Sequence, residues 1–392
     1  MIDSFSAEER LVLLSADRAS KEADRTAYLA VIKSVKDWNQ GLSLLSDRAA
    51  AALCLKHLRD WDLTGAVPAE VLSGLERIRL KVLSRNMLLM GHFQQIAAAF
   101  EARNIDLIPL KGIYLSDVLY GDLSLRQFSD LDLLVRPEQS DTALSCLHEM
   151  GYSHKGIPMS QFVAAHQDVV HFPPMSKQGV SVEIHIRLHQ KSMPYQVHVP
   201  SLWEEAQPEK VHGASVLAFN TEDLLLHLCL HLDKHFESSK FQFTSYYDLV
   251  NMLNHRQVDW DRFQQKMRNA QAQGHVEKHL ILVALYMGAA LPEHLKLLWK
   301  NALQQGDIRC FSDMLHGRYQ TNYLEMLRRS SRQFDRPTDW IRYWFGLFFP
   351  QKSFMFYRYR LTASHQLLWA YPKRLLGAIP ALLRGLYRRL RY

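Results

Sequence analysis

The chain has 392 residues, of which 47% are hydrophobic and 22% charged, a globular composition long enough for two or three domains rather than a disordered protein. The formal net charge of +7 comes from one end, because residues 341–392 carry ten Lys and Arg and no Asp or Glu, which leaves 37 basic and 40 acidic residues elsewhere. A slightly acidic body gives little support to nucleic-acid binding.

The first 100 residues are predicted to be helical, because apolar side chains recur there at the spacing that places them on one helix face. Pro68 is suited to begin one of these helices, since proline is tolerated in a first turn. The clearest apolar groups are Leu42, Leu44, Leu45, Ala49, Ala52, Leu53 and Leu58, and Leu80, Val82, Leu83, Met87, Leu88 and Met90.

A short apolar strand is predicted over residues 105–110, and after Lys111 and Gly112 the apolar residues of 113–120 return to helical spacing. Backbone N–H groups at such a helix start can face an anion, and a glycine removes the Cβ that would block close approach. An ordinary strand-to-helix turn is the alternative. Arg126 likewise allows two interpretations, a phosphate contact or an exposed loop arginine.

Asp130 and Asp132 form the most informative pattern, two carboxylates separated by one apolar residue within the run 129–135. On a β-strand both acids would point one way, while Leu131 and Leu133 point into a core. Two acids on one strand face cost repulsion and desolvation unless a cation lies between them. Mg²⁺ would supply that charge, because carboxylate oxygens are its preferred protein ligands; a solvated strand face is the alternative.

A second acid-bearing strand is predicted at residues 182–186, where strict alternation puts Glu183 and His185 on one face. Three carboxylates on adjacent strands can hold two Mg²⁺ ions, which stabilise the attacking and leaving oxygens of a phosphoryl displacement. Taken alone, Glu183 would be a solvent-facing strand residue.

Helices are predicted again after about residue 220. His227, His231 and His235 lie four residues apart and would share one helix face. Packing and hydrogen bonding are favoured over a metal site, because the glutamate of a zinc-protease helix is missing and no other ligand cluster accompanies them. Asp248 would either orient a basic or hydroxyl group near the cleft or cap a local turn.

The end of the chain is a basic amphipathic segment. Such a helix can lie on an anionic membrane surface, although docking of its apolar face on the protein is favoured here. No stretch approaches the roughly 20 apolar residues that a membrane span requires. The aromatic residues of 343–349 are expected in a core or an interface. The apolar positions of the final helix are Leu376, Ile379, Leu382, Leu383, Leu386 and Leu390.

Together these patterns resemble the uncharacterised nucleotidyltransferase family of the polymerase-β-like superfamily, over roughly residues 30 to 380. The resemblance implies an α+β fold, in which a small mixed β-sheet nucleotidyltransferase core is flanked by N-terminal and C-terminal helical regions. The residues that carry it are, in chain order, Leu110-Lys111-Gly112, Arg126, 130–135, 182–185, 222–231 and 247–250. The implied regions are 1–100 (N-terminal helical), 101–215 (catalytic core), 216–340 (C-terminal helical) and 341–392 (basic tail).

The resemblance also implies an activity, a Mg²⁺-dependent transfer of a nucleoside monophosphate from a nucleotide triphosphate, with ATP as the expected donor, to an acceptor with release of pyrophosphate. The acceptor stays open among small molecules, peptides and proteins. The implied catalytic residues and ligands of two Mg²⁺ ions are Asp130, Asp132 and Glu183, and the implied nucleotide-binding residues are Lys111, Gly112 and Arg126.

Two positions depart from the wider superfamily. Lys111 and Gly112 stand where Gly-Ser is usual, and Glu183 stands where an aspartate is common. The missing serine motivates a second hypothesis, a non-catalytic nucleotide-binding or regulatory protein, for example an accessory protein of a biosynthetic pathway.

The cysteines point to a cytoplasmic protein, with peripheral contact at the inner membrane surface as an option for the tail. Their scattered spacing argues against a disulfide framework and a zinc site, and fits a reducing compartment. Residues 1–30 are rich in charge, so we expect no secretory signal there. The four cysteines are Cys54, Cys146, Cys229 and Cys310.

Overall fold

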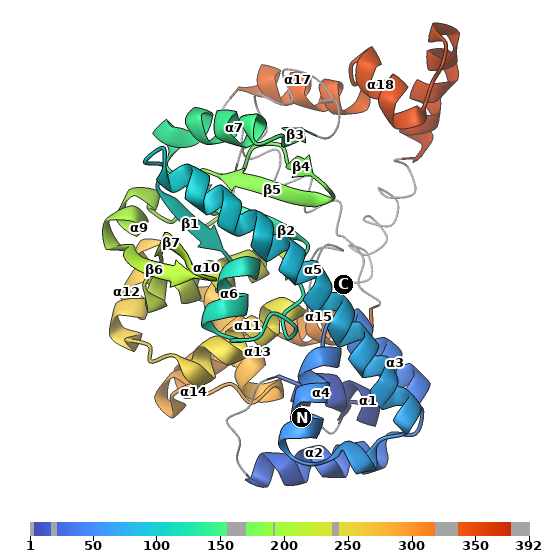
Figure 1. Ribbon diagram of the computed structural model, residues 1–392, viewed down its shortest axis with the longest axis vertical. Helices are drawn as coiled ribbons and strands as arrows, with labels where there is room; N and C mark the ends of the chain where they lie inside the picture. Colours follow the sequence, from blue (N-terminus) through green and yellow to red (C-terminus); the bar gives the residue numbers. More distant parts are fainter. Residues whose placement is uncertain are drawn as a thin grey trace.

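The structure is a computed structural model that describes residues 4–16, 22–154, 170–190, 193–236, 243–317 and 336–377. The fold is α+β, as predicted: a five-stranded mixed sheet and a two-stranded hairpin are surrounded by helices (Figure 1). One apolar core runs through the described parts of the chain from Phe5 to Leu315 and joins the helical regions to the sheet.

The N-terminal region is helical, as its apolar spacing predicts. Its first helix begins with a reciprocal cap, in which the Ser6 hydroxyl accepts from the Glu9 N–H and the Glu9 carboxylate accepts from the Ser6 N–H. Pro68 is the residue immediately before the longest helix, α5, which extends from the N-terminal helices to the sheet (Figure 1). The helices are α1 (Ala7–Leu14), α2 (Glu22–Ser34), α3 (Trp38–Asp47), α4 (Ala51–Asp60) and α5 (Ala69–Glu101), with a 3-10 turn, η2 (Thr64–Ala66).

The main sheet has the strand order β1-β2-β5-β4-β3. β1 and β2 are antiparallel, whereas β2 and β5 are parallel, and their register places Asp132 opposite Glu183. Leu131 and Leu133 are fully buried, as the alternation in this strand predicts. The strands are β1 (Leu107–Leu110), β2 (Asp130–Val135), β3 (Ser153–His154), β4 (Met175–Lys177) and β5 (Val180–His185).

Helices between and after the strands complete the main body. The segment after Lys111 folds into a short helix. Residues 137–149 form a 3-10 turn followed by a helix that stops before Gly151, whose φ is +87°. These elements are α6 (Gly112–Val118), η3 (Pro137–Gln139), α7 (Ser140–Glu149), α9 (Val199–Glu205), β6 (Gln207–Val211), β7 (Ala214–Ala218), α10 (Thr221–Phe236), α11 (Thr244–His255), α12 (Trp260–Asn269), α13 (Gln273–Tyr286), α14 (Glu293–Trp299), η4 (Lys300–Ala302) and α15 (Gln305–Leu315).

The last described segment, residues 336–377, contains α17 (Pro337–Phe348), α18 (Lys352–Tyr359) and the turn η5 (Ser364–Gln366). It has a small apolar cluster of its own around Met355, Leu361 and Ala370. The predicted terminal helix lies outside the described residues from 378 onward, and Leu376, the one position of its apolar pattern that is described, is exposed. Among the described residues, no helix combines the length and apolar character of a membrane span.

Candidate active site

A polar cavity of about 620 Å³ lies where β2 and β5 face α10. All three acids predicted from the sequence line it, and so do Lys111, Gly112 and Arg126. Residues separated by up to about 140 positions in the chain therefore meet around one space.

Asp132 and Glu183 lie side by side because β2 and β5 pair in parallel with these two residues in register. An oxygen of each carboxylate and a ring nitrogen of His185 all lie within 4.8 Å of one another. The predicted convergence of Asp132 and Glu183 is thus confirmed. Asp130 borders the same cavity two residues earlier on β2, outside this tight group.

Asp132 is the electrostatic centre of the cavity. Its Oδ2 is 2.7 Å from Lys111 Nζ, and its Oδ1 is 3.0 Å from His185 Nε2. Burial alone would raise the pKa of Asp132, but the Lys111 ammonium and the His185 ring outweigh it and hold that pKa well below its usual range. Asp132 is therefore ionised at neutral pH.

The other two carboxylates behave in the opposite way. Burial, together with repulsion from Asp132, raises the pKa of Asp130. Burial also raises the pKa of Glu183, although His171 Nε2, 3.5 Å from its Oε2, opposes the shift. An additional positive charge among these carboxylates would therefore be favourable.

Lys111 is positioned by an unusual backbone conformation. It is the residue that precedes α6, with φ +46° and ψ −111°, a combination that L-residues with a side chain seldom adopt. Such a conformation costs on the order of 1–3 kcal/mol and is found mainly at functional sites. Its ammonium also approaches His231 Nδ1, at 3.5 Å.

Gly112 has a packing role that the sequence did not indicate. A Cβ at this position would lie 2.8 Å from Cβ and Cγ of Phe128, closer than real side chains approach. The absence of a side chain is thus required by Phe128, and the proposed approach of an anion to this backbone stays a prediction.

Arg126 forms a buried ion pair with Asp248 of α11. Its Nε is 2.8 Å from Asp248 Oδ1 and its Nη2 is 2.7 Å from Oδ2, and the Tyr120 hydroxyl donates to Oδ1 as well, at 2.9 Å. Of the two interpretations of Asp248, the orientation of a basic and a hydroxyl group is therefore confirmed. Because the Arg126 guanidinium is already paired with Asp248, its contact with a phosphate stays a prediction.

Replacing Asp248 with alanine should lower the free energy of unfolding by about 3–5 kcal/mol, because Arg126 would keep its charge in a buried place without a partner. Chemical denaturation would measure the change. Asp106→Ala is the matched control, since it removes the 2.6 Å partner of the partly exposed Arg136, a pair worth only about 0–1 kcal/mol. Equal losses in the two variants would contradict the role given to the Arg126–Asp248 pair.

The three histidines of α10 lie along one face, as predicted, with ring centroids 6.2 Å apart for His227–His231 and 4.8 Å for His231–His235. All three border the cavity. Burial and the nearby Lys111 charge lower the pKa of His227 and His231 well below the usual histidine value, so both rings are neutral. In the described part of the chain, the group with metal-ligand spacing does not include them.

His185, His171 and Lys234 were not predicted as site residues. The alternation of β5 already put His185 on the face of Glu183, so that signal was present in the sequence. His171 reaches the cavity because it forms a β-bridge with His185, outside any predicted strand. Lys234 lies one turn beyond His231 on α10. The spacing of residues in the sequence gave little reason to select either of them.

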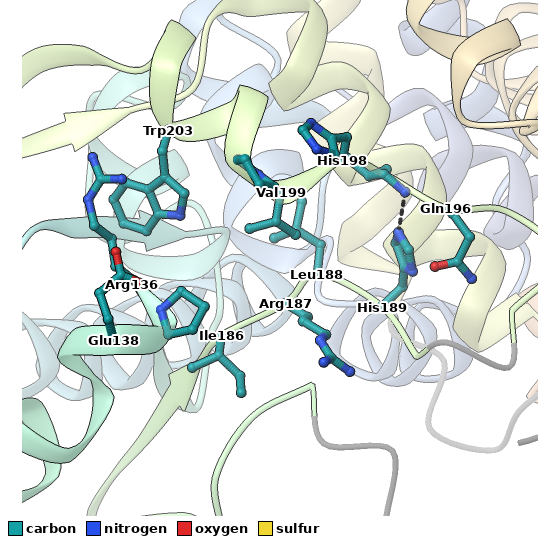
Figure 2. Close-up of a pocket in the computed structure, with 13 residues that line it drawn as sticks. Arg136, Glu138, Ile186, Arg187, Leu188, His189, Gln196, His198, Val199 and Trp203 are labelled. Carbon is teal, nitrogen blue, oxygen red and sulfur yellow. Dashed lines mark hydrogen bonds between the residues drawn. The ribbon is translucent and has the colours of Figure 1, made fainter.

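A second cavity, of about 400 Å³, adjoins the first, and Leu188 lines both. Figure 2 shows Trp203 and Arg136 at one end of it and His189 and His198 at the other. The Arg136 guanidinium carbon lies 4.6 Å from the centroid of the Trp203 ring, and the Val197 N–H donates to His189 Nε2 at 2.9 Å. Apolar side chains line this cavity together with charged and polar ones.

Comparison with known proteins identifies a family. Residues 34–288 match the model of a family described as an uncharacterised nucleotidyltransferase. No curated protein matches the chain. A solved structure with limited similarity is that of the antibiotic-resistance factor ANT(2'')-Ia, at 10% sequence identity and a TM-score of 0.34, over 47% of this chain and 91% of that chain.

Proposed function

Because the chain belongs to the uncharacterised nucleotidyltransferase family, we propose that it is a Mg²⁺-dependent enzyme that moves a nucleoside monophosphate from a nucleotide triphosphate to an acceptor and releases pyrophosphate. The observation that carries this proposal is the meeting of Asp132 and Glu183, with Asp130 beside them, on one wall of a polar cavity. ATP is the expected donor.

The acid wall, which is formed by Asp130, Asp132 and Glu183, fits a divalent cation. Carboxylate oxygens are the ligands that Mg²⁺ prefers. Burial and repulsion from Asp132 raise the pKa values of Asp130 and Glu183, and a bound cation would offset that repulsion. We propose that Asp130, Asp132 and Glu183 hold two ions. Bound there, Mg²⁺ would stabilise the charge on the attacking and leaving oxygens of the transfer.

The residues of the chain would then have separate tasks. Glu183, whose pKa is raised by burial, would accept the proton of the acceptor hydroxyl. The hydroxyl oxygen of the acceptor would then bond to the α-phosphorus while the bond between the α-phosphorus and pyrophosphate breaks. Lys111 and the Gly112 backbone would contact the phosphates, with Arg126 as a weaker candidate. Lys234 of α10 faces the same cavity and would add a further positive charge.

The acceptor is best accommodated in the second cavity. It adjoins the acid wall across Leu188, and it begins at the residues that directly follow β5. Its mixture of apolar and polar lining residues favours a small organic molecule or the side chain of a peptide or protein.

Calorimetry with the four nucleotide triphosphates in the presence and absence of Mg²⁺ tests the proposal. We expect binding that requires Mg²⁺, because four phosphate charges would otherwise face the acid wall. A Glu183→Gln variant should bind nucleotide but fail to transfer an α-labelled monophosphate. Mg²⁺-dependent binding without transfer to any acceptor would favour the alternative, a non-catalytic nucleotide-binding protein, and no binding of any nucleotide would contradict both.

A further inference from the structure

The segment 336–377 exposes large apolar side chains to an unusual degree. Ile341, Phe345 and Phe349 follow one another at intervals of four residues, so they lie along one face of α17 and its C-cap residue, and they are 59%, 63% and 44% exposed. Leu368 and Trp369, which follow α18, are 81% and 48% exposed. A contiguous apolar face of this kind on a protein surface marks an interaction site.

The apolar face is accompanied by positive charge. Among residues 336–377 the one acidic side chain is Asp339, and none occurs from Ile341 to the end of the chain. Exposed basic residues are spread through the same segment, and Lys373 Nζ lies 5.6 Å from the centroid of the Trp369 ring. These basic residues are Arg342, Lys352, Arg358, Arg360 and Lys373.

Among the described residues, the apolar cluster of this segment is separate from the core of the body. Met355, Leu361 and Ala370 form one cluster within the segment, the main core ends at Leu315, and Tyr343 of α17 is buried outside both clusters. Figure 1 shows α17 and α18 at one end of the molecule, on the side of α7 and β3 and apart from α10. The docking predicted for the terminal helix concerns residues that lie mostly outside the described ones, and it stays a prediction.

We propose that residues 336–377 bind the surface of an anionic lipid bilayer. Exposed Trp and Phe rings suit the headgroup region, where their apolar bodies reach the acyl boundary. The Lys and Arg side chains would meet anionic headgroups, and the lack of carboxylates removes the repulsion that such a surface would exert. A bilayer satisfies both features at once, whereas a protein partner would have to match each of them.

Vesicle flotation of the full chain tests this proposal, with vesicles of phosphatidylcholine containing phosphatidylglycerol and vesicles of phosphatidylcholine alone. We expect binding to the anionic vesicles that weakens as salt rises, since screening acts within about 10 Å at 0.1 M salt. Each basic residue near an anionic surface contributes about fivefold to partitioning, so Lys352→Gln, Arg358→Gln and Lys373→Gln together should reduce it about a hundredfold.

Phe345→Ser combined with Trp369→Ser should also abolish flotation while leaving the thermal melting curve unchanged, because both side chains are exposed. The matched control is Leu297→Ser with Leu298→Ser, which removes two exposed apolar side chains of α14 and should not affect binding. Equal binding of all variants, or no binding to the anionic vesicles, would overturn the proposal. So would self-association that is lost in the Phe345/Trp369 variant without any vesicle binding, since the apolar face would then belong to an interface between two copies.

Discussion

Replacing Asp132 with asparagine is expected to abolish nucleotidyl transfer and to leave the fold intact. The pKa of this carboxylate is held well below its usual range by Lys111 and His185, and Asp132 lies opposite Glu183 in the register of β2 and β5. An asparagine removes the charge that would hold a divalent ion but keeps an oxygen that can accept from Lys111 or His185. A bound metal ion contributes several kcal/mol of transition-state stabilisation. Without the ion, the rate should be about a thousandfold lower or more.

Transfer of an α-labelled monophosphate, measured with saturating Mg²⁺, would give the rate of this variant. Asp141→Asn is the control, because Asp141 is an exposed aspartate in the first turn of α7, away from the cavity. It should retain the parental rate, and both variants should melt at similar temperatures. A fully active Asp132→Asn protein would remove Asp132 from the catalytic machinery and with it the proposed metal site.

The acid wall could be predicted because its pattern is local. Alternation within β2 and β5 fixes which side chains share a face, whatever the rest of the chain does. The register of the two strands could not be predicted in this way, since a parallel pair is joined by a long connection and no local pattern records how its strands align. His185 shows the same limit, because its face was predictable but its contact with Asp132 was not.

The remaining parts of the site depend on contacts between distant segments. Arg126 and Asp248 are 122 positions apart, and neither residue carries a local signal for the other. Gly112 has a plausible local explanation in its helix start, yet Phe128 supplies the steric reason for a glycine there. Lys111 was predicted to face phosphates, and the structure instead places its ammonium on Asp132.

The contact between Lys111 and Asp132 leads to a second large expected effect. A Lys111→Met substitution should raise the affinity for the metal alone and lower the affinity for Mg²⁺–ATP. The ammonium now neutralises the carboxylate that a divalent ion would need, so we propose that Lys111 leaves Asp132 for the phosphates when metal and nucleotide arrive together. Methionine has a similar length but no charge. Without its competitor, Mg²⁺ or Mn²⁺ alone should bind about ten- to a hundredfold more tightly, given that a charge-assisted contact contributes about 1.5–3 kcal/mol.

Binding of the Mg²⁺–ATP complex should become weaker in the same variant, because the phosphates lose an ammonium partner. Loss of Lys111 also removes the nearest positive charge that lowers the pKa of Asp132, so that pKa should rise and protons should compete with the metal at higher pH than in the parent protein. Calorimetry with the metal alone and with Mg²⁺–ATP would measure both affinities as a function of pH.

Lys81→Met controls for the loss of one positive charge, because Lys81 is an exposed lysine of α5 that does not border the cavity. It should leave both affinities unchanged. If Lys111→Met weakens metal and nucleotide binding together, the lysine holds Asp132 in place and exchange is excluded. If Lys111→Met strengthens metal binding while ATP fails to bind even the parent protein, the competition between Lys111 and the metal for Asp132 is supported. The proposal that a nucleotide is the substrate is then contradicted. The metal titration thus separates the role of Lys111 from the activity of the enzyme.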